Sequence, residues 1–219
     1  MGQRGRYTDT LFGLKQRFLR HVSPALEMGR SFVRQEYQKS YSSLLLLWKG
    51  LARFVVQNPK YKSLFGPVSI TNEYKTASRQ LIARYFKEQN ALPELARLVR
   101  PRTPLKEQHW LKNAARTLVT DLDDLVELLA DIESDQKGIP VLLRQYLKLG
   151  GKLLAFNVDH EFADALDGLI VVDLLRTDRK TLERYMGKEG LTRFLAFHGL
   201  GQVAAEHSAA RPQGNAGSG

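Results

Sequence analysis

Cysteine is absent from the chain of 219 residues, and tryptophan and methionine are rare, with two and three residues. Without a thiol, the chain can form no disulfide, use no thiolate nucleophile and build no zinc or iron–sulfur site on cysteine. Long apolar runs are absent too: the longest, Leu44 to Trp48, is far shorter than the roughly 20 residues that span a membrane. Residues 1–6 also lack the apolar segment of a secretory signal. We therefore expect neither a disulfide scaffold, a secretory signal nor a membrane-spanning helix.

Familiar motifs of nucleotide-binding and hydrolytic enzymes are also missing. The sequence contains no Gly-x-Gly-x-x-Gly, no phosphate-binding loop ending in Gly-Lys-Ser/Thr and no Gly-x-Ser-x-Gly elbow. No two of the five histidines are four residues apart, which is the spacing that places two metal ligands on one helix face. His160 precedes Asp164 by four residues, whereas the His–Asp pair of glycerolipid acyltransferases needs a spacing of five. We therefore expect no metal site and none of these chemistries.

Positive charge is concentrated in the first half of the chain. Residues 1–120 carry 22 Lys and Arg against 7 Asp and Glu, whereas residues 121–219 carry 11 against 16, within a total of +10. A basic half favours an anionic partner, such as nucleic acid, a phospholipid surface, an acidic carrier protein or a phosphorylated cofactor. A solvated basic surface without a dedicated ligand has the same composition, so charge alone does not choose among these partners.

The spacing of apolar residues predicts a mixed α/β fold with helices on the faces of a sheet. Pro67 cannot donate a ladder bond, so its strand either lies at an edge or has parted from its neighbour there. We predict an acidic helix over residues 121–135 and interpret it as a solvated face, with pairing to the basic half of the chain as the alternative. The predicted strands are 26–33 (bulged after Gly29), 64–70, 152–158 and 168–174, and the further helices are 42–57, 75–89, one between Pro140 and Gly150, 178–186 and 191–198.

One cluster of side chains could carry chemistry. Glu27 and Arg30 are three residues apart on the predicted bulged strand, and a bulge lets both reach one cleft. The carboxylate could take a proton from an attacking amine, and the guanidinium could hold a carboxylate with two hydrogen bonds. The turn of residues 34–40 enters a helix N-terminus, which favours a bound anion. The alternative is an ion pair between Glu27 and Arg30 with a purely structural role.

Several blocks in this order resemble the haemolysin-like acyltransferases of the GNAT superfamily, whose relatives include the ornithine-lipid N-acyltransferases and, more distantly, the acyl-homoserine-lactone synthases. The resemblance extends from about Tyr7 to His198. It is carried by the segments ALEMGRSFV (25–33), YQKSY (37–41), LLLWKG (45–50), LFGPVSI (64–70), GIPVLLRQYLKLG (138–150), FNVD (156–159) and LDG (166–168).

The resemblance implies transfer of a fatty acyl group from a thioester of acyl-carrier protein, or of coenzyme A, to an amine such as an amino acid. The thioester is a co-substrate, and no tightly bound cofactor is expected. The thioester would lie where strand 26–33 splays from strand 64–70, with backbone N–H groups polarising its carbonyl. Glu27 and Arg30 match the catalytic positions. The acyl and phosphopantetheine region would include Ser31, Val33, Arg34, Lys39, Ser40, Trp48 and Ser69.

The resemblance also implies a single GNAT-like domain over residues 1–205, with a helical insertion at about 91–137 and a disordered tail at 206–219. Members of this family carry further strands before the segment matched here, so we expect the first strands to be lacking and a partner segment or chain to complete the domain. An acidic acyl-carrier protein is the expected partner, in the cytoplasm or at the inner face of the membrane, where peripheral contact is a further expectation. Nucleic acid is disfavoured because the basic residues lack an aromatic stacking surface. The alternative function is a non-catalytic basic module for nucleic acid or anionic membrane, or an inactive fragment.

Overall fold

The structure is a computed structural model that describes residues 5–29, 34–37, 41–89, 92–108 and 119–201. The chain divides into two compact units. Unit 1 comprises Met1–Arg34 and Tyr61–Asp178, and unit 2 comprises Gln35–Lys60 and Arg179–Gly219. Both units combine segments that are far apart in the sequence.

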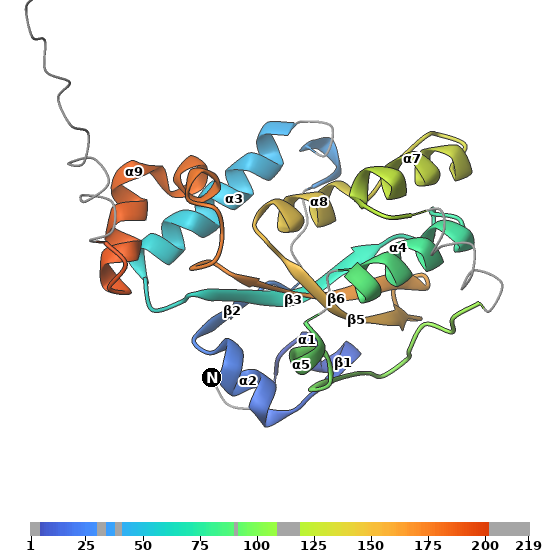
Figure 1. The fold of residues 1–219 in the computed structure, drawn as a ribbon, viewed down its shortest axis with the longest axis horizontal. Coiled ribbons are helices and arrows are strands. Elements are labelled where there is room, and N and C mark those ends of the chain that lie inside the picture. Colours follow the sequence, from blue (N-terminus) through green and yellow to red (C-terminus); the bar gives the residue numbers. More distant parts are fainter. Residues whose placement is uncertain (1–4, 30–33, 38–40, 90–91, 109–118, 202–219) are drawn as a thin grey trace, which may run out of the picture. The chain divides into compact units, whose positions relative to one another are not determined.

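The centre of unit 1 is a four-stranded sheet in the order β2-β3-β6-β5 (Figure 1). β2 runs parallel to β3, whereas β6 is antiparallel to both β3 and β5. Every residue of β6 except the last is buried, as expected of a central strand covered on both faces. The bounds are Ala25–Glu27 for β2, Ser63–Ile70 for β3, Lys152–Asp159 for β5 and Ala165–Asp173 for β6.

Helices α4 (Thr76–Gln89), α7 (Leu122–Ile132) and α8 (Val141–Lys148) cover one face of this sheet (Figure 1). The other face carries short elements from two remote parts of the sequence. These are α1 (Thr8–Leu11), α2 (Gln16–Val22), α5 (Pro93–Ala96) and a ribbon in which β1 (Phe12–Leu14) pairs with β4 (Val99–Pro101).

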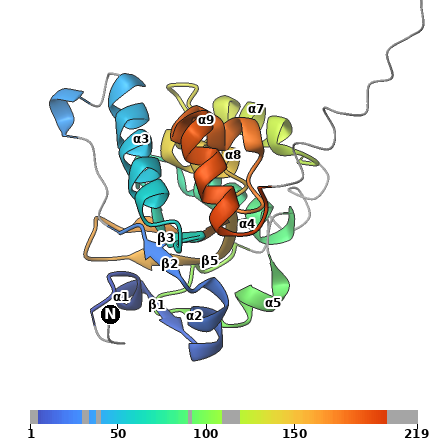
Figure 2. The ribbon, with the colours of Figure 1, turned by 90° about the vertical axis from the view of Figure 1, so that its left-hand side faces the viewer.

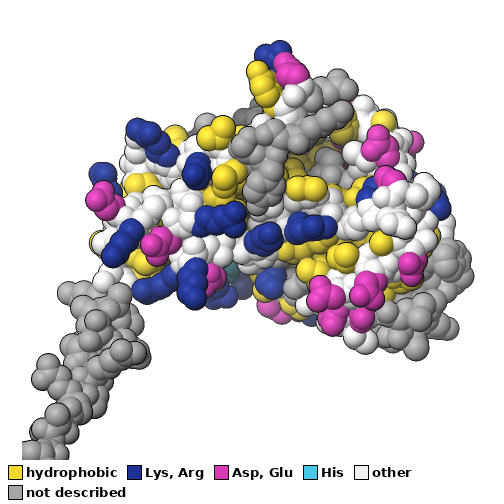
Figure 3. Space-filling model, turned by 90° about the horizontal axis from the view of Figure 1, so that it is seen from above, with side chains coloured by type: hydrophobic (Ala, Val, Ile, Leu, Met, Phe, Trp, Pro, Cys, Tyr) yellow, Lys and Arg dark blue, Asp and Glu magenta, His cyan; other side chains and the backbone are white. Residues whose placement is uncertain are grey.

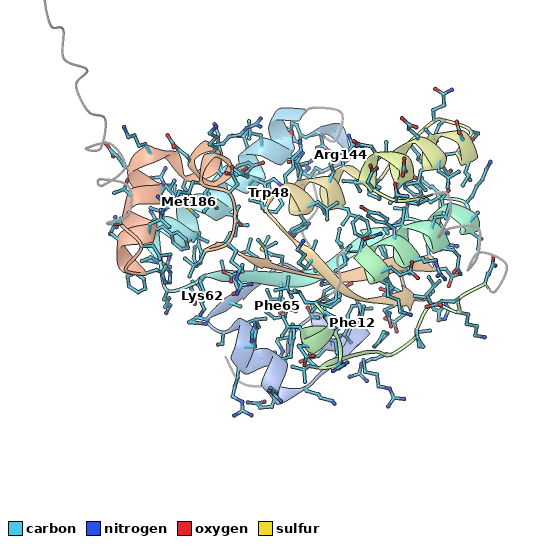
Figure 4. The ribbon with its side chains drawn as sticks, viewed as in Figure 1. Phe12, Trp48, Lys62, Phe65, Arg144 and Met186 are labelled. Carbon is cyan, nitrogen blue, oxygen red and sulfur yellow. The ribbon has the colours of Figure 1, made fainter. Side chains whose placement is uncertain are left out.

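An apolar cluster fixes these short elements to the sheet. Phe12 and Phe18 are fully buried, and Phe18 meets Phe65 of β3 edge-on with ring centroids 6.0 Å apart. Phe12 and Phe65 are labelled in Figure 4, on β1 and β3. Each buried aromatic ring contributes a large apolar area, so the segment before β2 is packed firmly against this face.

In its described residues, unit 2 is mainly helical. α3 (Tyr41–Gln57) and α9 (Arg179–Phe197) lie side by side (Figure 2), and a three-residue 3-10 turn (Gln35–Tyr37) precedes α3. Trp48 of α3 packs against Tyr185 of α9, with ring centroids 6.2 Å apart. α9 is broken at Gly187, whose φ of 74° is not helical, which matches the prediction of two helices there.

The predicted mixed α/β class is confirmed, and most helices and strands lie where the apolar spacing places them. Two predictions need correction. β2 ends at Glu27, where its ladder to β3 stops, so the described residues Met28 and Gly29 lie outside the strand, and residues 30–33 of the predicted strand lie outside the described residues. The helix of residues 121–135 is not wholly a solvated face, since Glu133 at its end is buried. The single domain over 1–205, with its insertion and tail, stays a prediction.

Candidate functional site

β2 and β3 separate partway along their length. The parallel ladder ends at Glu27 opposite Phe65, and the last bond runs from the Met28 N–H to the Phe65 carbonyl oxygen, 2.7 Å apart. β3 continues to Ile70 with β6 paired along its other edge. Beyond Phe65, no described strand pairs with the edge of β3 that faces β2, so this edge is open as far as the described residues show.

The orientation of the backbone along this open edge follows from that last bond. The backbone N–H and C=O groups of successive residues in a strand point alternately to its two edges. The backbone groups of Pro67 and Ser69 therefore point to the same edge of β3 as those of Phe65. Proline has no N–H to leave unpaired, which makes Ser69 the first residue after the separation with a backbone N–H directed to the open edge. Such a donor can pair with an amide or thioester carbonyl laid along the strand.

Gly66 marks the point where the strands part. Its φ is +158°, and a Cβ built there would lie 2.3 Å from the carbonyl oxygen of Met28. That distance is to backbone rather than to a flexible side chain, so any substitution would push β2 away. The glycine therefore sets how closely the two strands approach before they separate.

Glu27 is half-buried and ties the start of α1 to β2. Its Oε1 accepts a hydrogen bond from the backbone N–H of Thr8 at 2.6 Å. The bond satisfies an N–H at the first turn of α1 that has no helical partner. One carboxylate oxygen of Glu27 thus has a structural role, which the sequence alone does not indicate.

A polar row crosses the sheet two residues beyond Pro67. Ser69 of β3, Asp167 of β6 and Asn157 of β5 are in register on three adjacent strands. The hydroxyl of the exposed Ser69 donates to Oδ1 of Asp167 at 2.5 Å. Asp167 is only 2% exposed, and in the described part of the chain no donor reaches its Oδ2. Burial raises the pKa of Asp167 to about 6, and the nearby charge of Asp159 adds to this.

Asn157, in the same row, by contrast has a hydrogen-bond partner for each of its two side-chain polar atoms. Its Oδ1 accepts from the backbone N–H of Thr103 at 2.7 Å, and its Nδ2 donates to the carbonyl of Val158 at 3.1 Å. Asn157 and Asp159 line a cavity of about 590 Å³. The other residues around this cavity include Tyr7, Arg102 and Glu161.

The structure brings together only part of the predicted site. Glu27 and Ser69 lie on neighbouring strands of unit 1, and Arg34 is exposed. Trp48, labelled in Figure 4, belongs to unit 2, where it is buried. The predicted residues Arg30, Ser31, Val33, Lys39 and Ser40 lie outside the described residues.

Asp167 and Thr8 were not predicted as site residues. A signal for Asp167 exists in the sequence, because an acid interrupts the otherwise apolar run of residues 165–172. The predicted strand began at Gly168 and so excluded it. Thr8 gives no comparable signal, since its contact with Glu27 joins two segments 19 residues apart.

Comparison with known families gives a match to the first part of the chain. Residues 1–49 match the family model of the acetyltransferase (GNAT) domain. The matched segment includes α1, β2 and Glu27. It supports a place in the GNAT superfamily and an acyl transfer of the acetyltransferase type, without distinguishing the haemolysin-like branch. Neither a curated protein nor a solved structure matches the chain.

The described residues show neither a membrane-spanning helix nor a cluster of metal ligands. No described helix combines the length and the apolar character needed to cross a bilayer. Within the same residues, no group of three or more His, Asp or Glu is arranged to hold a metal ion. The candidate site consists of Glu27, the open edge of β3 and the polar row.

Proposed function

We propose that the chain is an N-acyltransferase that moves a fatty acyl group from a carrier thioester to an amine. The observation that carries the proposal is the separation of β2 from β3 after Glu27 and Phe65, inside a chain whose first 49 residues match a GNAT domain. An extended pantetheine arm carries amides that can pair with an open strand edge as an added strand does. The Ser69 N–H is directed to that edge.

Glu27 is the proposed proton acceptor, with Arg30 as its partner in the site. An amine must lose a proton as it attacks a carbonyl, and a carboxylate can take it directly or through water. The bond from Thr8 occupies Oε1 of Glu27, which holds the side chain in place and leaves Oε2 for this role. Within unit 1, the thioester would be bound by Ser31, Val33, Arg34 and Ser69.

The test measures release of the carrier thiol. The full chain is mixed with palmitoyl-acyl-carrier protein or palmitoyl-coenzyme A and a panel of primary amines, and free thiol is detected with a thiol reagent. Because the chain has no cysteine, it contributes no background. We expect Glu27→Gln to slow transfer about 10²-fold or more, while Asp131→Asn on the exposed side of α7 keeps the wild-type rate. Equal rates for wild type and Glu27→Gln would remove Glu27 from the mechanism, and no transfer with any donor would refute the function.

Docking of an acidic acyl-carrier protein is the proposed partner interaction. Arg34, exposed at the end of unit 1, and Lys39 belong to the basic half of the chain. Attraction between opposite charges mainly raises the association rate, and salt screens it. Arg34→Glu should therefore slow association several-fold at low salt and have a smaller effect at high salt. Association rates that are unchanged at every ionic strength would argue against docking here.

Peripheral contact with an anionic membrane is a second proposal, supported by α3. Leu46 is 67% exposed and Phe54 is 44% exposed, and α3 carries Lys49 and Arg53 but no acid. Figure 3 shows Lys and Arg side chains among hydrophobic ones over α3 and α9. Apolar anchors beside cations are what an anionic bilayer surface binds. Sedimentation with phosphatidylglycerol vesicles should exceed that with phosphatidylcholine vesicles and fall in Leu46→Ser; equal, weak sedimentation with both would refute the contact.

A further inference from the structure

The pair formed by Ser69 and Asp167 has an incomplete set of hydrogen bonds that a structural role does not explain. Buried polar groups in folded proteins are almost always hydrogen-bonded. Asp167 has one bond, from Ser69, and in the described residues its Oδ2 has no donor although the side chain is only 2% exposed. Asn157, one strand away, has a partner for each of its two side-chain polar atoms. The deficiency is thus specific to the carboxyl group.

The direction of the bond between the two side chains determines what Ser69 offers to a ligand. A serine hydroxyl has one proton and two lone pairs. The proton is given to Oδ1 of Asp167, so the exposed side of the oxygen can only accept a hydrogen bond. A hydroxyl whose proton is held by a carboxylate is also a stronger acceptor, because the two bonds polarise each other. Ser69 therefore fits a ligand that donates.

The charge around the row determines what kind of donor fits. Asp159 on β5 is the charged neighbour whose field reaches Asp167, and it is an acid; Ser69 on β3 does not titrate. Asp159 also lines the cavity at the other end of the row, together with Glu161, Arg102 and His160, and Arg102 Nε donates to the Asp9 carbonyl at 2.8 Å. In the row itself, the acids Asp167 and Asp159 repel anions and attract cations. A cationic nitrogen satisfies both the hydrogen-bond direction and the charge.

We propose that Ser69 and Asp167 form a binding site for an alkylammonium group, in which the ammonium N–H donates to Ser69 Oγ and the carboxylate of Asp167 lies behind it. The site would select a cationic amine as the acceptor of the acyl group. This assignment rests on the proposed function, because an amine is what that reaction consumes. Ser69 is then a specificity-determining residue, and Asp167 acts through it.

The test uses the full chain with ¹³C-labelled aspartate and n-butylamine as the probe. At neutral pH, we expect a saturable shift of the Asp167 carboxyl resonance, absent when 1-pentanol replaces the amine. Ser69→Ala should abolish the shift, while the control Asp131→Asn should retain it; circular dichroism checks that both variants fold. A carboxyl resonance that does not respond to butylamine, or that responds equally in Ser69→Ala, would overturn the proposal.

Steady-state kinetics distinguish a failure of this ammonium site from a failure of the proposed acyltransferase function. If transfer occurs, Ser69→Ala should raise KM for cationic amines about tenfold with little change in kcat, whereas Glu27→Gln should lower kcat. An unchanged KM for Ser69→Ala would overturn the proposal while leaving the acyltransferase intact. If the wild type transfers nothing, the proposed function fails, and the nuclear magnetic resonance titration still decides whether an ammonium group binds here.

Discussion

Two acids are buried in unit 1, and their surroundings differ. Glu133, at the end of α7, is 4% exposed; its Oε1 accepts from the Lys75 N–H at 2.8 Å, and Lys137 Nζ lies 3.9 Å from Oε2. Asp167 is 2% exposed and receives one bond, from a neutral hydroxyl. A buried charge is stable when it is paired and hydrogen-bonded. Glu133 meets that condition and joins α7 to α4, whereas Asp167 does not.

The surroundings of Glu133 extend the contrast. The Lys75 ammonium donates to the Ile132 carbonyl, and the Tyr74 hydroxyl donates to the Gly138 carbonyl at 2.8 Å. Burial, helped by the charge of Glu133, raises the pKa of Tyr74 to about 12, so this hydroxyl keeps its proton. Each of these bonds joins segments about 60 residues apart, so the bonds around Glu133 stabilise the fold. A buried acid with its hydrogen bonds satisfied thus has a structural role, whereas an unsatisfied one is a candidate for function.

The largest expected change in stability comes from removing the satisfied acid. Glu133→Ala leaves the Lys75 N–H without its acceptor and opens a space at the end of α7. Loss of a buried charged partner should lower the free energy of unfolding by about 3 kcal/mol, measured by urea denaturation. Glu133→Gln, which keeps an acceptor oxygen, should cost about 1 kcal/mol. A loss below about 1 kcal/mol for Glu133→Ala would contradict the structural role of Glu133.

Removing the charge of the unsatisfied acid, Asp167, should have the opposite effect on the free energy of unfolding at neutral pH. The pKa of Asp167 is about 6 in the folded chain and about 3.9 in the unfolded one, so the native state binds the proton more tightly. The stabilisation from this group is full below about pH 4 and is lost as the pH rises through 6. Relative to wild type, Asp167→Asn should therefore gain about 2 kcal/mol in free energy of unfolding between pH 4 and pH 7.

Urea denaturation of both proteins at a series of pH values measures that gain. Asp131→Asn provides the control, because neutralising an exposed acid on α7 should give a difference from wild type that hardly changes over this range. A flat difference for Asp167→Asn as well would show that Asp167 has an ordinary pKa.

Removing the N-cap of α7 should lower the free energy of unfolding by a smaller amount. Asp121 accepts hydrogen bonds from the N–H groups of Asp123 and Asp124, at 2.8 and 2.9 Å, and Asp124 completes a capping box. A hydrogen bond from the Thr120 hydroxyl lowers the pKa of Asp124. Asp121→Ala should cost about 1 kcal/mol, and Asp121→Asn, which keeps an acceptor, much less. Equal losses for Asp121→Ala and Asp121→Asn would show that Asp121 stabilises α7 through its charge rather than through its capping hydrogen bonds.

The smallest effect is expected for an acid on the exposed face of α7. Asp131 is exposed, and none of the hydrogen bonds described above involves it. Asp131→Asn should change the free energy of unfolding by less than about 0.5 kcal/mol. A larger loss would mean that the exposed face of α7 contacts another part of the chain.

Regular elements could be predicted from the sequence because their apolar residues repeat. α3, α4 and β3 lie within one residue of the predicted bounds, since each buries one face or stripe whose period shows in the sequence. Pro67 also correctly indicated the point where β3 loses its neighbour. The ribbon of β1 and β4 was not predicted, because strands of three residues carry no period and their partners are about 90 residues apart.

The candidate site could be predicted only in part. Glu27 stands out in the sequence, but its bond to Thr8 depends on how α1 packs. Glu133 is one of many acids between residues 121 and 135. Its bond from the Lys75 N–H, 58 residues away, distinguishes it from the others, and no local pattern indicates that bond. Asp167 and Ser69 are 98 residues apart, so their pairing follows from the register of β3 and β6, which no local pattern specifies.

The most direct test of the central contrast is a titration of the aspartate side-chain carboxyls by ¹³C nuclear magnetic resonance, with Asp167→Asn assigning the signal. We predict that the Asp167 carboxyl titrates near pH 6, about two units above the ordinary value of an aspartate. A pKa near 4 for Asp167 would contradict it, because the carboxyl would then be as well solvated or as well paired as any surface acid.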